Sequence, residues 1–194
     1  MLPLLLILFQ NLISRVGLIM LLAFIMTRVK FFRKLVVKQN INVKDKIILS
    51  IIFGIYGIIG TYTGIPIRGA IANARVIGVF VGGLLGGPVV GTLPGLIAGR
   101  HRFLIDIGGF TAISCGLSTF VEGIMSGFLK KKIDRSDNKF TFAFIAGIIA
   151  EVLQMIIILI FSKPFSEAWE LVKIIGIPMI IANGLGIAVC ISII

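Results

Sequence analysis

Six long apolar stretches run through the sequence and restrict what the chain can fold into. They cover residues 1–27, 47–67, 76–99, 108–129, 140–161 and 171–194. A helix needs roughly 20 apolar residues to cross the hydrocarbon core of a bilayer, and each stretch reaches about that length. Only 14% of all residues are charged, whereas a soluble domain keeps about 25%. The sequence therefore predicts an all-α integral membrane protein, with residues 1–194 forming a single membrane-embedded module.

The stretch 76–99 differs from the other five because glycine and proline interrupt it. Four glycines and Pro88 lie between positions 82 and 88, and Pro94 follows as a second predicted break. Irregular backbone at membrane depth is tolerated only where protein or a cavity surrounds it. We expect a broken, re-entrant segment that returns to the side from which it enters.

Two basic loops predict the topology of the chain. Residues 28–46 carry seven Lys and Arg against one Asp, and residues 130–139 carry five against two. Short basic loops stay on the cytoplasmic side, so an even number of crossings separates them. With 76–99 re-entrant, this predicts a five-transmembrane helix bundle with its N-terminus outside and its C-terminus cytoplasmic. Six spanning helices remain the alternative if one basic loop violates the rule.

The distribution of charged and metal-binding residues excludes several functions. The 19 Lys and Arg exceed the 8 Asp and Glu, but most lie in those short loops, so no nucleic-acid partner is expected. The sequence has one His, no paired metal-ligand spacing and no nucleotide-binding motif, so we predict no metal, no cofactor and no catalytic residue. Cys115 and Cys190 lie inside apolar stretches, which makes a disulfide framework improbable.

Cations flank both ends of the broken segment. Arg75 precedes it, and Arg100, His101 and Arg102 follow it, so a re-entrant segment brings them together near the outer face. Arginine presents a planar fork of donors that matches a carboxylate, which predicts a site for a small anion. Headgroup anchoring of helix ends remains the alternative reading.

Several polar residues lie within predicted crossings. Cys115 and Ser118 are three residues apart and share a helix face, so they could donate hydrogen bonds to a ligand or only pack at a tight contact. A charge at membrane depth costs about 2.5–3.5 kcal/mol on insertion scales, so each buried charge is expected to face the interior and have a partner. These residues are Arg15, Glu122 and Glu151, with Arg15 expected to pair with one of the glutamates; a proton relay is the functional alternative. Asn183 follows Pro178 and is expected to hydrogen-bond across helices or to serve a kink.

A set of short motifs in a fixed order resembles a known family. They are Arg15-Val16-Gly17, Asn73-Ala74-Arg75, the run from Gly82 to Gly91, Gly95 to Gly99, Gly108-Gly109-Phe110-Thr111-Ala112, and Pro178 to Asn183. Together they resemble the five-transmembrane receptor module of the LytS/YehU/YhcK type, over nearly the whole chain.

The resemblance implies a sensor function in the bacterial cytoplasmic membrane. Members of the family join this module to a GAF domain and histidine kinase, or to a diguanylate cyclase. The histidine kinases of the family are linked to control of autolysis and the cell wall. Some of them respond to pyruvate. It implies a two-component sensor module that binds a small carboxylate through residues at matching positions, forms a homodimer, and reaches a response regulator only through cytoplasmic domains. Those catalytic domains are not among these residues, which read as a module cut from a longer protein. The implied ligand residues are Asn73, Arg75, Arg102, Cys115 and Ser118, with Arg102 preferred to Arg100. A small secondary transporter of organic anions and a dimerising membrane scaffold remain the alternatives.

Overall fold

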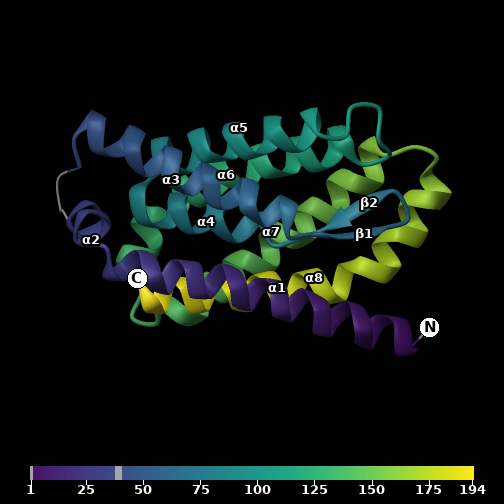
Figure 1. Ribbon diagram of the computed structural model, residues 1–194, viewed down its shortest axis with the longest axis horizontal. Helices are drawn as coiled ribbons and strands as arrows, with labels where there is room; N and C mark the ends of the chain where they lie inside the picture. The colour runs from purple at the N-terminus through teal and green to yellow at the C-terminus, as the bar shows by residue number, and fades with distance from the viewer. Residues whose placement is uncertain (1, 38–40) are drawn as a thin grey trace.

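The computed structural model describes residues 2–37 and 41–194, which form a bundle of helices with one small sheet (Figure 1). The elements are α1 (Leu2–Arg28), α2 (Lys30–Val37), α3 (Val43–Tyr62), β1 (Ile65–Ile67), β2 (Ala70–Ala72), α4 (Arg75–Gly86), α5 (Pro88–Leu104), α6 (Ala112–Asp134), α7 (Lys139–Phe161) and α8 (Phe165–Ile193). Among the described helices, α1, α6, α7 and α8 are long and apolar enough to cross a membrane, and α3 adds a fifth long helix of 20 residues. The predicted all-α membrane bundle is confirmed.

The broken segment forms a helical hairpin made of α4 and α5. The two helices meet at Gly87, whose φ of 82° is accessible to glycine without strain, and Pro88 begins α5. Both outer ends of the hairpin lie at the same end of the bundle, as predicted for a re-entrant segment (Figure 1). The predicted second break is wrong, because Pro94 lies inside α5, which continues to Leu104.

Glycines bring this hairpin into backbone contact with α6. A Cβ atom on Gly91 would lie 2.2 Å from the Gly123 carbonyl oxygen, and one on Gly99 would lie 2.5 Å from that of Gly116. A Cβ atom on Gly83 would lie 1.9 Å from the Ser126 hydroxyl. We call these contacts, together with Gly95 and Gly127, the glycine seam. Small residues allow such close helix approach in membranes, where burial of apolar surface does not drive helix association.

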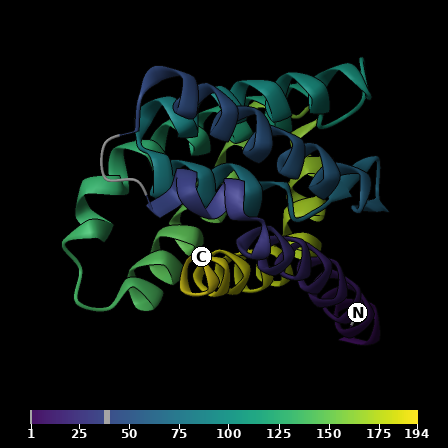
Figure 2. The ribbon, with the colours of Figure 1, turned by 60° about the vertical axis from the view of Figure 1, so that its left-hand side comes forward.

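The long helices enclose this hairpin and turn apolar faces outward. Helices α3 and α6 pack against α4 and α5, α7 packs between α6 and α8, and α1 lies along α8 (Figures 1 and 2). On α7 the exposed side chains recur every three or four residues, which places them on one helix face. They are Ile145, Ile149, Val152, Ile156 and Ile160. This face suits contact with lipid.

The two predicted basic loops lie at one end of the bundle, which we call the basic end. Asn42 and Lys46 from the start of α3 line one pocket together with Lys130 and Lys131 from the end of α6 and the hairpin turn at Gly87. The shared location agrees with their assignment to one side of the membrane.

A β-hairpin occupies the opposite end of the molecule and was not predicted. β1 and β2 pair antiparallel, with Ile65 opposite Ala72. Arg68 and Gly69 both have positive φ, as a two-residue hairpin turn requires. The predicted apolar helix to residue 67 is therefore wrong, because α3 ends at Tyr62. Pro66 lacks the N–H that would continue a helix.

Candidate functional site

Arg75, the first residue of α4, is buried and faces α6. Its side chain is only 1% exposed. Its backbone N–H donates to Asn73 Oδ1 at 3.0 Å, which orients the start of the helix. The guanidinium donates from Nε to Thr119 Oγ1 at 2.6 Å and from Nη2 to the Cys115 carbonyl at 3.3 Å. Its Nη1 has no hydrogen-bond partner among the described residues.

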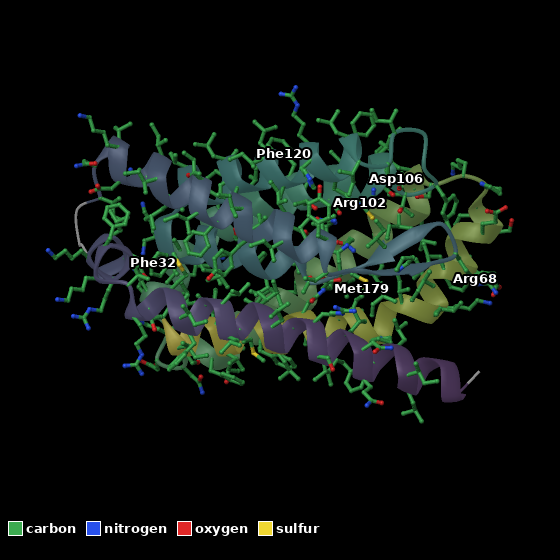
Figure 3. The ribbon with its side chains drawn as sticks, in the orientation of Figure 1. Phe32, Arg68, Arg102, Asp106, Phe120 and Met179 are labelled. Carbon is green, nitrogen blue, oxygen red and sulfur yellow. The ribbon has the colours of Figure 1, made fainter. Side chains whose placement is uncertain are left out.

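Arg102, in the last turn of α5, is also fully buried, whereas Arg100 is exposed. Arg102 Nη2 donates to Thr111 Oγ1 at 3.1 Å and to Asp106 Oδ2 at 3.0 Å (Figure 3). Asp106 is 31% exposed, so solvent shares this carboxylate. Nε and Nη1 of Arg102 have no partner among the described residues. The structure thus distinguishes the buried Arg102 from the exposed Arg100, which the spacing in the sequence did not do.

Both guanidinium groups hydrogen-bond to residues at the beginning of α6. Thr111 precedes the helix, and Cys115 and Thr119 follow at intervals of one turn. Arg75 and Arg102 are close enough to interact electrostatically. The two cations repel each other, although Asp106 pairs with Arg102, and three of their nitrogens have no hydrogen-bond partner among the described residues. An anion between them would relieve the repulsion and accept hydrogen bonds from these donors.

Cys115 and Ser118 meet at the carbonyl to which Arg75 donates, and their role as ligand residues stays a prediction. Both are buried. The Cys115 carbonyl accepts from Arg75, from the Ser118 hydroxyl at 3.1 Å and from the Thr119 hydroxyl at 2.8 Å. Ser118 also faces Gln154 Oε1 on α7 at 3.5 Å. Thr111 and Thr119 were not predicted as site residues, although their four-residue spacing from Cys115 places all three on one face of α6.

Asn183 links three parts of the chain. Its Nδ2 donates to the Asn73 carbonyl at 3.0 Å and to Glu151 Oε1 at 2.7 Å. The expected hydrogen bonding across helices is therefore confirmed. The Asn73 side chain hydrogen-bonds to backbone groups: its Nδ2 donates to the Ile71 carbonyl at 2.6 Å, and its Oδ1 accepts from the Arg75 N–H. The junction between β2 and α4 is thereby tied to α7 and α8.

The expected pairing of Arg15 with a buried glutamate is wrong. Arg15 is exposed, because α1 turns Leu12, Val16 and Ile19 toward the bundle instead. Glu122 and Glu151 are fully buried, as expected, and both lie within electrostatic range of Arg75.

Several acceptor atoms near these carboxylates are unpaired. Both carboxyl oxygens of Glu122, Glu151 Oε2 and Asn183 Oδ1 have no partner among the described residues. We call Arg75, Arg102, Glu122, Glu151 and Asn183 the polar cluster.

Fold and cluster together define a multi-pass helical membrane protein with a buried, charged site inside the bundle. The family model described as "5TMR of 5TMR-LYT" matches residues 29–194, and the chain belongs to this five-transmembrane receptor family.

Curated relatives carry sensor names. The chain is 44% identical to the sensor protein LytS of Bacillus subtilis, over 94% of this chain and 33% of that protein. It is 38% identical to the sensor histidine kinase BtsS of Escherichia coli (91% and 32%) and 35% identical to the sensor histidine kinase YpdA of the same organism (88% and 30%). The chain spans about a third of the length of these relatives. No solved structure matches it significantly.

Proposed function

We propose that this chain is the sensor module of a membrane histidine kinase and binds a small carboxylate, such as pyruvate, between Arg75 and Arg102. One observation carries the proposal: two fully buried arginines, from the first turn of α4 and the last turn of α5, both hydrogen-bond to residues at the beginning of α6 and have nitrogens without a partner among the described residues. The family membership and the sensor names of the relatives support the same function.

The chemistry of the site follows from its donors. Arg75 Nη1 and Arg102 Nη1 and Nε have no partner among the described residues, so they are available to a carboxylate, whose single negative charge would offset the repulsion between the two arginines. The Cys115 thiol would donate to the rest of a small ligand, and the Ser118 hydroxyl would do so by exchanging its present bond to the Cys115 carbonyl for one to the ligand. Asn73 acts by fixing the backbone of Arg75.

A ligand held in this way would connect the hairpin to the last helix. Arg75 begins α4, Arg102 lies near the end of α5, and Asn183 of α8 bonds to the residue two positions before Arg75. A ligand shifts an equilibrium only through different affinities for two packings, so a site between separately moving elements is the effective location. In the proposed topology the N-terminus is outside and α8 runs toward the cytoplasm. There, a homodimer would pass the signal to kinase domains and a response regulator.

The test is a titration of the purified module in lipid nanodiscs with labelled pyruvate. We expect saturable binding that weakens at least about 30-fold in Arg75→Ala and in Arg102→Ala, since truncating one partner of a buried charged hydrogen bond costs about 2 kcal/mol or more. Arg100→Ala removes an exposed cation two residues from Arg102 and is the matched control, with unchanged affinity expected. Circular dichroism verifies that each variant is folded.

Full affinity in a folded Arg75→Ala, Arg102→Ala double variant would contradict the site. Net uptake of pyruvate into proteoliposomes would instead support a transporter. If the titration shows no saturable binding, the dimerising scaffold would be the supported alternative.

A further inference from the structure

A basic pocket lies at the basic end of the molecule, far from the polar cluster. It has a volume of about 530 Å³ and lies between the end of α1, the short helix α2 and the last turn of α8. Among the described residues, the lining includes Arg28, Lys30 and Arg33, and no Asp or Glu. Arg28 lies over the ring of Phe24 at 4.8 Å, which leaves its guanidinium edge available to an anion.

Helix α2 is held in place beside this pocket by its apolar face. Phe32 and Leu35 are buried, and the Phe32 ring packs edge-on against Phe53 of α3 at a centroid distance of 6.0 Å (Phe32 is labelled in Figure 3). The opposite face of α2 exposes Lys30, Arg33 and Lys34. A short amphipathic helix that directly follows a membrane-spanning helix, with cations on its polar face, has the form of an element at the lipid headgroup level.

An exposed apolar stripe on α1 leads into the pocket. Leu21, Phe24 and Ile25 are exposed, and their spacing places them on the same helix face as Arg28. The surface therefore combines an apolar track at the depth of acyl chains with a cationic pocket at its end. That combination matches an amphiphile with an anionic head and apolar tails.

We infer that this pocket binds the phosphate headgroup of an anionic phospholipid in the leaflet at the basic end, with an acyl chain along the α1 stripe. Three cations select a headgroup of net negative charge. None of the described lining residues has an acidic side chain that could receive the ammonium group of a zwitterionic lipid. Because Ile193 and Ile194 also line the pocket, the bound lipid would hold α1, α2 and the end of α8 together.

Native mass spectrometry of the purified protein, equilibrated with equal amounts of phosphatidylglycerol and phosphatidylcholine, tests the inference. We expect the parent to retain phosphatidylglycerol preferentially. The variant Arg28→Gln, Lys30→Gln, Arg33→Gln should lower that preference at least about tenfold, since each cation near a membrane surface contributes about fivefold. The matched control is Lys44→Gln, Lys132→Gln, Arg135→Gln, which removes the same charge from exposed positions at the same end and should keep the preference.

Equal loss in both variants would show diffuse attraction to the basic end and overturn the pocket, and so would an unchanged preference in both. Displacement of the lipid by soluble glycerol phosphate would show that the α1 stripe plays no part and would also overturn the inference. Photoactivatable phosphatidylglycerol gives an independent readout in unmutated protein. Adducts are expected within residues 18–36, and adducts confined to residues 128–139 would contradict the site.

Discussion

The glycine seam and the polar cluster share helices α4, α5 and α6 but are packed in opposite ways. In the seam, backbones touch directly, and a single added carbon at Gly91 or Gly99 would overlap a carbonyl oxygen. In the cluster, large charged side chains are buried between the helices, and several of their polar atoms have no partner among the described residues. The seam therefore has no space for a side chain larger than glycine at these positions. The cluster, in contrast, has polar atoms that could still form hydrogen bonds to a ligand or to water.

The comparison predicts the largest loss of stability in the seam. Gly91→Ala places a Cβ atom 2.2 Å from the Gly123 carbonyl oxygen, and the helix backbones must separate to accommodate it. We expect destabilisation of about 3 kcal/mol, at the upper end for overpacking, measured by thermal unfolding in detergent. Gly17→Ala in α1 is the matched control, because a Cβ atom there meets nothing within 4 Å. Equal melting temperatures for the two variants would show that the seam is not tight.

A smaller loss is expected at the link between the cluster and α8. Asn183→Ala removes the donor shared by Glu151 Oε1 and the Asn73 carbonyl and leaves both acceptors buried. Leaving a buried polar group unsatisfied costs about 1–3 kcal/mol, so we expect about 2 kcal/mol in the same unfolding assay. A double-mutant cycle with Glu151→Ala isolates the pair, and a coupling energy near zero would argue against this hydrogen bond.

A still smaller effect is expected for the hydroxyl pair between α6 and the start of the α7–α8 connection. Ser114 and Ser162 are buried with their Oγ atoms 2.8 Å apart. Hydrogen bonds between membrane helices average about 0.6 kcal/mol in double-mutant cycles, so Ser114→Ala should cost about that amount. Ser14→Ala is the control, because Ser14 is exposed on α1 and its hydroxyl donates to the Gln10 carbonyl within the same helix. A larger loss of stability in Ser114→Ala than in Asn183→Ala would contradict the expected order of the two effects.

The smallest change is expected at Glu122, where the two regions meet. Its carboxyl oxygens have no partner among the described residues, so Glu122→Gln keeps the shape of the side chain and removes a buried ionisable group without breaking any hydrogen bond that the structure describes. We expect stability to stay within about 0.5 kcal/mol of the parent or to rise. A loss comparable to that of Asn183→Ala would show that Glu122 is ionised and held by Arg75.

Local composition was enough to predict much of this molecule. The lengths of the apolar stretches predicted the long helices, Gly87-Pro88 predicted the turn of the hairpin, and the basic loops were correctly placed at one end. These features depend on neighbours in the chain: apolar length against bilayer thickness, and the backbone freedom of glycine beside proline. The candidate ligand residues were also named from sequence, although their binding role remains a prediction.

Which way each side chain faces was decided by tertiary packing. Arg15 was expected inside and is exposed, because α1 contacts the bundle mainly through α8 and needs only one apolar face. Glu151 meets Asn183, 32 residues away, and Asn183 meets Asn73, 110 residues away. The burial of Arg102 rather than Arg100 depends on which face of α5 packs against α6. A helix of known length can rotate about its axis at little local cost, so only contacts between helices select the face that becomes the site.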